Sequence, residues 1–234
     1  MSVPALRGDR VSSPRLAQFA QAWGIPFDSA EHPDASVLAL GEVDSERLAL
    51  ALAPPVVACV EAGGGTDWAG PSFAPTVEQA GLYLCLTAGS AHGAEPALAV
   101  CTALSARLDL DEAVRQSIEL ALHEALANAI IHGSLGVAAP PEATVDQFMA
   151  FIDDVERRLA DPEYAGRRVE IFATWDDAIL RIGVRDQGEG YRTQCNENAS
   201  ADRKSGRGLL LIQELATAVQ IGEGGRRLTM EFRR

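Results

Sequence analysis

The stretch Asp111–Gly133, DEAVRQSIELALHEALANAIIHG, governs the interpretation of the whole chain. It predicts one long helix that Asp111 caps and Gly133 ends. Its buried face consists of apolar residues at helical spacing: Ile118, Leu122, Ala125 and Ala129. Glu124 and Asn128 are four residues apart and therefore share a face, and His132 continues that stripe one turn later. A solvated polar pair and a functional pair are both compatible with this helix alone.

The composition limits the classes of protein to consider. The chain has 234 residues, 47% of them hydrophobic, which is enough for one large domain or two small ones. A formal net charge of -13 argues against a nucleic-acid partner and an anionic membrane surface, because phosphate groups require clustered Lys and Arg. We see neither a signal-peptide pattern nor an apolar run of membrane-spanning length. With four scattered cysteines and no CxxC motif, we expect a cytoplasmic protein with reduced thiols.

The N-terminal third has the pattern of a small α/β unit. Three short apolar runs predict strands that are covered on both faces: residues 37–40, 56–60 and 82–86. A helix at 45–53 connects the first two, which favours a parallel arrangement. Residues 1–13 are expected to be loose, and Gly24 to end a short helix. We therefore expect an α/β module at 1–78 and a second domain at 79–234.

The remaining two thirds alternate between helices and strands. In chain order, the patterns predict a loop at 87–96, a helix at 97–108, an inserted helical segment at 138–168, strands at 167–175 and 178–186, a helix from 208 to 219 and a strand at 226–232. Thr144 opens the inserted helix with the form of a capping box, and Asp176-Asp177 is typical of the turn of a hairpin. Strands and helices in this order predict an α/β fold.

Three features point to a nucleotide when they are taken together. Gly206-Arg207-Gly208 precedes an apolar helix, where free N–H groups and the helix dipole attract an anion. Asp186 ends a strand beside glycines, so its carboxylate can accept a hydrogen bond from an amino group next to room for a flat ring. Glu124 and Asn128 offer oxygen atoms of the kind that Mg²⁺ takes alongside phosphates and water.

The same motifs resemble those of a known superfamily. EALAN with its trailing HG, DQGEG and SGRGLLLI are similar to the N, G1 and G2 boxes of the GHKL ATPases, which include histidine kinases, gyrase, Hsp90 and MutL. Within that group, the sequence of these motifs most resembles that of the bacterial anti-sigma-factor serine kinases. The resemblance covers roughly residues 80–234. It implies a two-layer α/β sandwich with a mixed sheet that binds ATP and Mg²⁺.

The resemblance also implies a role for each matching residue. Glu124 would be the general base, Asn128 the Mg²⁺ ligand and Asp186 the acceptor for the adenine amino group. The other nucleotide contacts would come from Gly188 and Gly190 in the base pocket, Gly206, Arg207, Gly208 and Leu209 at the phosphates, and Thr229 beside adenine. Residues 192–205 would form a lid, with Lys204 meeting the terminal phosphate. A solvated charge is the alternative for Lys204, since lysine is mostly exposed.

The resemblance gives a leading function and two alternatives. The leading function is transfer of the γ-phosphate to Ser or Thr of a protein partner: a sigma factor, an anti-anti-sigma factor or another signalling protein. The alternatives are a non-catalytic module whose nucleotide controls partner binding, and a detached sensor histidine kinase domain, which a lid without an aromatic box disfavours. A homodimer is compatible with each of them.

The segment 1–78 is similar to a degenerate receiver domain. The strand VLALG ends without an acidic residue, and the chain has no lysine before Lys204. A working receiver needs clustered acidic residues and a lysine. We therefore expect a regulatory or contact module that does not accept phosphate.

Overall fold

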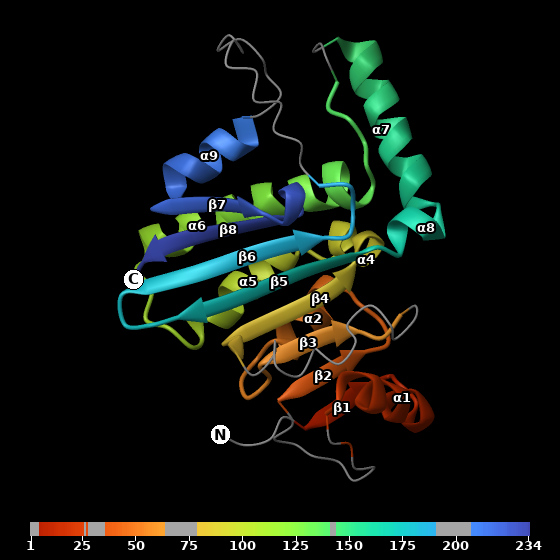
Figure 1. Cartoon of the computed structure of the whole chain (residues 1–234), viewed down its shortest axis with the longest axis vertical. Coiled ribbons are helices and arrows are strands. Elements are labelled where there is room, and N and C mark those ends of the chain that lie inside the picture. Colours follow the sequence, from red (N-terminus) through yellow and green to blue (C-terminus); the bar gives the residue numbers. More distant parts are fainter. Residues whose placement is uncertain (1–4, 26, 28–35, 64–78, 141–143, 191–206) are drawn as a thin grey trace.

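A computed structural model describes residues 5–25, 27, 36–63, 79–140, 144–190 and 207–234, and the structural statements below concern these residues. They form an eight-stranded mixed sheet in the order β1-β2-β3-β4-β5-β6-β8-β7, with helices on both faces (Figure 1). The strands are β1 (Leu6–Asp9), β2 (Val37–Leu40), β3 (Ala58–Glu61), β4 (Leu82–Thr87), β5 (Arg168–Trp175), β6 (Ile179–Asp186), β7 (Ala218–Gly222) and β8 (Arg227–Arg233). The predicted α/β class is therefore confirmed.

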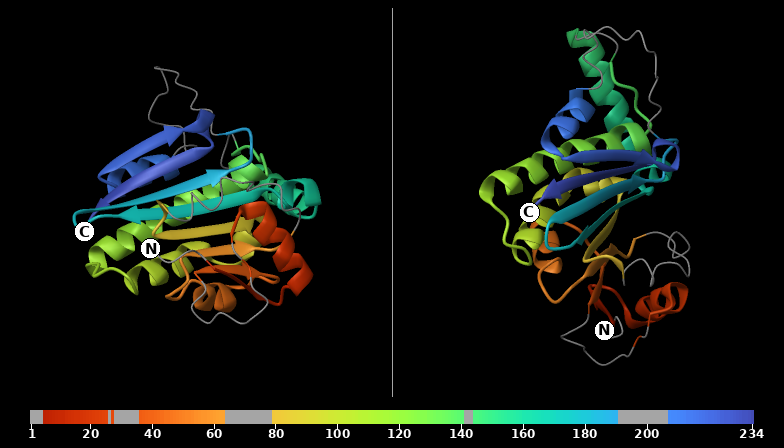
Figure 2. Two further views of the ribbon diagram at one scale, coloured as in Figure 1. Left: turned by 60° about the horizontal axis from the view of Figure 1, so that its bottom comes forward. Right: turned by 60° about the vertical axis from the view of Figure 1, so that its left-hand side comes forward.

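Most of the helices lie on one face of the sheet, and α1 lies on the other (Figure 2). They are α1 (Ser13–Trp23), α2 (Ser45–Ala51), α4 (Ala88–Gly93), α5 (Pro96–Ser105), α6 (Glu112–Ala127), α7 (Val145–Leu159), α8 (Pro162–Ala165) and α9 (Arg207–Leu215). A π-helical turn, η2 (Asn128–Ser134), continues α6, and a 3-10 turn, η3 (Glu223–Gly225), joins β7 to β8. No helix of the described residues is both long and apolar enough to cross a membrane.

The sheet joins the N-terminal region to the rest of the chain. Strands β1 to β4 pair in parallel, whereas β4, β5, β6, β8 and β7 pair antiparallel. The register places Val60 of β3 beside Cys85 of β4, so the pairing is uninterrupted between the two regions. The division into units at 1–78 and 79–234 remains a prediction. The strands predicted at 37–40, 56–60 and 82–86 and the β5–β6 hairpin are confirmed.

Three predicted segments are corrected. Part of the supposedly loose 1–13 is strand β1, a four-residue edge strand too short to show a pattern. The supposed loop 87–96 contains α4, because the Thr87 hydroxyl accepts a hydrogen bond from the Ser90 N–H at 3.2 Å and caps a helix. The helix predicted to end at 219 stops at Leu215, since the residues from 218 onward pair with β8 instead.

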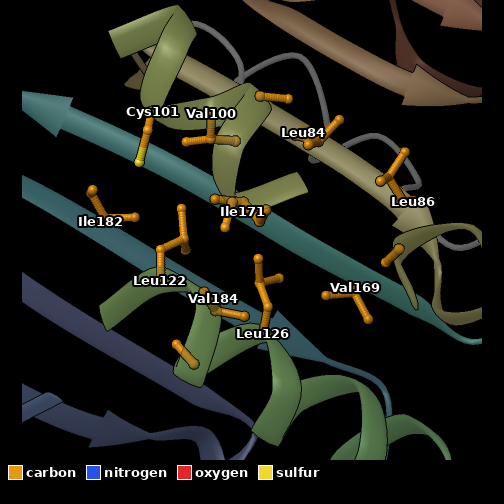
Figure 3. Packing of buried hydrophobic residues seen from close by; sticks show 14 of the residues in the cluster. Leu84, Leu86, Val100, Cys101, Leu122, Leu126, Val169, Ile171, Ile182 and Val184 are labelled. Atoms are coloured by element: carbon orange, nitrogen blue, oxygen red, sulfur yellow. The ribbon is translucent and has the colours of Figure 1, made fainter. Parts of the chain in front are cut away.

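The core holds α6 against the sheet (Figure 3). Leu122 and Leu126 of α6 pack with residues of α5 and of the central strands: Leu84, Val100, Cys101, Ile171 and Val184. Burying one leucine stabilises the fold by about 1.5–3 kcal/mol, so this contact fixes which face of α6 meets the sheet. Glu124 and Asn128 lie at the margin of that face and are partly exposed.

Candidate functional site

The helix that carries Glu124 changes its geometry at Asn128. It is α-helical to Ala127 and then forms the π-helical turn η2, in which the Leu135 N–H donates to the Ile130 carbonyl at 2.8 Å. π-Helical turns of this kind occur often at functional sites. The predicted end at Gly133 is wrong, because the left-handed residue is Gly136, with a φ of 65°.

The start of the same helix also differs in detail from the prediction. Asp111 occupies the N-cap position, but its side chain makes no capping hydrogen bond. Its backbone carbonyl instead accepts from the Arg115 N–H at 2.9 Å, which is the first bond of the helix. Glu112 supplies a negative charge in the first turn, where it stabilises the helix by interacting with the positive end of the helix dipole.

Asp186, Gly133 and Gly188 meet in a close three-way contact. Asp186 ends β6 with only 7% of its surface exposed, and its Oδ1 accepts a hydrogen bond from the Gly188 N–H at 2.7 Å. A Cβ atom on Gly133 would lie 2.5 Å from the Asp186 Cγ, and one on Gly188 would collide with the Gly133 carbonyl. The two glycines are therefore needed for this approach of η2 to the end of β6.

Burial changes the acidity of Asp186. Desolvation raises its pKa from 3.8 to about 6, although the Gly188 N–H and the charges of Arg226 and Arg167 act in the opposite direction. The carboxyl group is therefore largely ionised at neutral pH and becomes protonated in mildly acidic solution. An ionised carboxylate in a mostly apolar surrounding is a strong hydrogen-bond acceptor.

A cleft opens beside this carboxylate, between α6, η2 and the β6–β8–β7 part of the sheet. The polar side chains of its lining are Asn128, Asp186 and Arg226. The rest of the lining consists of apolar and small residues: Ala125, Ala129, Gly133, Val184, Leu209, Ile221, Gly225 and Leu228. Ala125 and Ala129 contribute only small side chains to this lining. A mostly apolar cleft with few polar groups suits the ring of a small-molecule ligand.

The start of α9 lies over Glu124 and Asn128. A Cβ atom on Gly208 would lie 2.6 Å from the Glu124 Oε2 and 3.6 Å from the Asn128 Nδ2. The first turn of α9, where the N–H groups have no partner within the helix itself, therefore faces the same helical surface as these two side chains. Exposed Arg207 begins this helix, and Leu209 reaches the cleft.

The structure does not bring all the predicted residues to this place. Leu228 and Val184 oppose each other and both line the cleft, so the alternation of a strand puts Thr229, opposite Gly183, on the other face of the sheet. Thr229 is therefore corrected: its side chain faces away from the cleft. Gly190 has a φ of 85° and packs against the Gly224 carbonyl, where it shapes the turn and is not part of the lining.

Two predicted residues and one segment lie outside the described residues: Lys204, Gly206 and the proposed lid at 192–205. Their roles remain predictions.

Arg226 was missed by sequence reasoning. Its carbonyl accepts a hydrogen bond from the Asp186 N–H at 3.0 Å, and its positive charge lowers the Asp186 pKa. It follows Gly224-Gly225 in the turn from η3 into β8. The run GEGG at 222–225 is typical of a turn that would place Arg226 at the start of a strand. That interpretation requires a strand before the run, and β7 was not predicted.

A ready-made metal cage is absent from the part of the chain that the structure describes. No group of three or more His, Cys, Asp or Glu side chains there could hold an ion. Mg²⁺ commonly takes one or two protein ligands and completes its shell with phosphates and water. The side chain of Asn128 lies at the cleft and beside the start of α9, and its amide oxygen is a ligand of the kind that this mode of binding uses.

These features define a nucleotide-binding α/β domain in which a helical polar pair, a buried strand-end aspartate and a glycine-led helix meet around one cleft. The family model of the histidine kinase-like ATPase domain matches residues 87–232. The chain belongs to this family, which is part of the GHKL ATPases, and the predicted resemblance is confirmed. No curated protein matches the chain.

Proposed function

We propose that this protein binds ATP with Mg²⁺ in the cleft between α6 and the β6–β8–β7 part of the sheet, and transfers the γ-phosphate to a serine or threonine of a partner protein. The observation that carries the proposal is the contact of Gly208 with Glu124 and Asn128. It joins the anion-binding start of a helix to a carboxylate and an amide at one end of an apolar cleft.

The adenine end of the site would be formed around Asp186. Its Oδ1 is engaged by the Gly188 N–H, and no other described residue donates a hydrogen bond to the carboxylate. The second oxygen is therefore available to an exocyclic amino group. Ala125, Ala129 and Val184 would contact the two faces or the edge of the ring through apolar surface. A guanine ring presents a carbonyl at the equivalent position and would meet this carboxylate unfavourably.

The phosphate end would be formed by α9 and α6. The N–H groups in the first turn of α9 and the guanidinium of Arg207 would hold phosphate oxygens. Asn128 would hold Mg²⁺, which when bound neutralises charge that develops on the phosphates. Glu124, half-buried beside Gly208, would accept the proton of the attacking hydroxyl.

The partner would be a protein, as in the anti-sigma-factor kinases: a sigma factor, an anti-anti-sigma factor or another signalling protein. The strongly negative chain is suited to a partner with a basic surface, because complementary charge increases the rate of association. A homodimer of this chain is compatible with the same chemistry.

The test is a transfer assay with ATP labelled at the γ-phosphate and purified candidate partners. We expect label on the partner that survives acid, as phosphoserine and phosphothreonine do, and a rate of labelling that is about 10²–10⁴-fold lower with Glu124→Ala. Label that acid removes would indicate a phosphohistidine and support the sensor-kinase alternative. ATP-dependent partner binding without any transfer would support the non-catalytic alternative.

A further inference from the structure

Helix α7 projects from the body of the molecule, and among the described residues it packs on the core through Phe151 and its C-terminal end (Figures 1 and 2). There Val155 is buried and Leu159 packs against the core, while Arg158 donates a hydrogen bond from Nη1 to the Leu135 carbonyl at 2.7 Å. At the outer end, Val145, Phe148 and Met149 are 77%, 54% and 53% exposed. The outer half of this helix therefore presents large apolar side chains to solvent.

These side chains form a continuous surface. Val145, Phe148, Met149 and Ile152 follow the spacing i, i+3, i+4, i+7 and share one face of the helix; we call them the α7 stripe. The other exposed large apolar residues of the described chain are distributed over five different elements: Leu50, Leu98, Leu120, Leu210 and Ile221. Isolated exposed apolar residues are normal, whereas a clustered set indicates an interaction surface.

The border of the α7 stripe is acidic. Asp146 and Asp153 lie along one edge of it, and Glu156 follows Ile152 one turn later on the same face. None of these three carboxylates forms an ion pair within the described residues. The arginines of this helix are already engaged, because Arg157 and Arg158 both pair with Asp154.

We propose that the α7 stripe is the docking site for a basic amphipathic helix of a partner protein. Such a helix would place its own apolar face on the stripe and its Lys or Arg side chains beside Asp146, Asp153 and Glu156. A second copy of this chain would bring like charges together at the same border. An anionic membrane would be repelled by the same carboxylates. The inference is independent of the proposed kinase activity, because docking requires no nucleotide.

The test uses the full chain without nucleotide and a fluorescently labelled synthetic peptide of leucine and lysine, with leucine at i, i+3, i+4 and i+7. Fluorescence anisotropy should show binding that Phe148→Ala with Met149→Ala weakens at least tenfold. Both positions are exposed, so the variant keeps the fold, which circular dichroism checks. Leu50→Ala, which removes an exposed leucine from α2, should bind the peptide as the parent does.

A second pair of variants tests the acidic border. Asp146→Asn with Asp153→Asn should weaken binding about tenfold and reduce its dependence on salt. Asp109→Asn with Asp177→Asn changes the net charge equally at exposed positions elsewhere and should have little effect. A peptide with glutamate in place of lysine should not bind.

Three results would overturn the proposal. The first is unchanged binding to the variant without Phe148 and Met149, which would show attraction by net charge alone. The second is an equal loss for the two charge variants. The third is self-association in sedimentation experiments that the loss of Phe148 and Met149 abolishes, which would assign the stripe to a second copy of the chain.

Discussion

Gly133 and Asp186 lie so close that a Cβ atom on the glycine would be 2.5 Å from both the Cγ and the Oδ1 of the aspartate. One residue belongs to the π-helical turn after α6 and the other to the end of β6. Their contact ties the helix of Glu124 and Asn128 to the strand that supplies the buried carboxylate. The geometry of the two ends of the proposed ATP site is therefore coupled through backbone packing.

Gly133→Ala is expected to displace the Asp186 carboxylate. Overpacking of this kind lowers the free energy of unfolding by about 1–3 kcal/mol, and ATP affinity should fall about tenfold or more. Titration calorimetry and chemical denaturation measure the two effects. Gly93→Ala is the matched control, because a Cβ there meets no atom within 4 Å. Unchanged affinity in Gly133→Ala would show that the contact is not needed for the base pocket.

Asp186→Asn should have opposite effects on binding and on stability. A hydrogen bond to a charged group contributes about 1.5–3 kcal/mol, so ATP affinity should fall about tenfold or more. The folded protein binds the Asp186 proton more tightly than the unfolded chain, with a pKa of about 6 against 3.8. The free energy of unfolding therefore falls as pH rises through that interval.

The neutral amide that Asp186→Asn introduces avoids this cost and can still accept from the Gly188 N–H. At pH 7 the variant without nucleotide should therefore be at least as stable as the parent in thermal denaturation. A clear loss of stability would show that the carboxylate has a structural partner that the geometry does not reveal.

The affinity for ATP should fall in mildly acidic solution. Desolvation raises the Asp186 pKa to about 6, and the protonated group no longer presents two acceptor oxygens. The affinity of the parent is divided by that of Asp186→Asn at each pH from 5 to 8. The effect of ATP protonation on binding cancels in this ratio, because it is the same for both proteins. We expect this ratio to approach one below pH 6 and to be constant above pH 7. A ratio independent of pH would exclude Asp186 as the titrating group.

The sequence was sufficient for the parts of the site that depend on local pattern. The face shared by Glu124 and Asn128 follows from helical spacing, and Asp186 follows from a strand that ends beside glycines. The sequence alone could not predict which face of the sheet the side chain of Thr229 occupies, because a shift of one residue in the strand register moves it to the other face. Strand β7 was missed because its apolar residues continue the helical pattern of α9 in the sequence. Their strand conformation depends on pairing with β8.

The π-helical turn after Ala127 had no signal in the sequence. Asn128 and Ala129 continue a 3.6-residue pattern, and the extra residue per turn appears only where η2 must reach Asp186. The contact of η2 with Asp186, which is distant in the sequence, therefore determines the π-helical geometry. The family motifs nevertheless identified the residues on both sides of it.

Tyr164 is expected to stabilise the end of that turn. The guanidinium groups of Arg158 and Arg167 lie 4.6 and 4.7 Å from the centre of its ring, and they donate to the carbonyls of Leu135 and Ser134. Tyr164→Leu should lower the free energy of unfolding by about 1–2 kcal/mol, the value of two partly exposed cation–π contacts. Tyr164→Phe keeps the ring and should restore stability in denaturant unfolding. Equal losses in both variants would assign the effect to the hydroxyl.

Glu124 and Asn128 should separate catalysis from binding. Glu124 lies beside Gly208, whereas Asn128 also lines the cleft. Glu124→Ala should leave ATP affinity nearly unchanged and reduce phosphotransfer by about 10²–10⁴, the usual contribution of a positioned general base. Asn128→Ala should weaken Mg²⁺-dependent binding and turnover together, because it removes a metal ligand.

Calorimetry with and without Mg²⁺, and transfer of labelled phosphate to the partner found in the assay above, measure these two quantities. Glu214→Ala, at an exposed position of α9, is the control for the loss of one glutamate. Full transfer by Glu124→Ala would show that another group takes the proton. A fall in affinity equal to that of Asn128→Ala would instead place Glu124 among the nucleotide-binding groups, since a base that acts only in the transition state contributes nothing to ground-state binding.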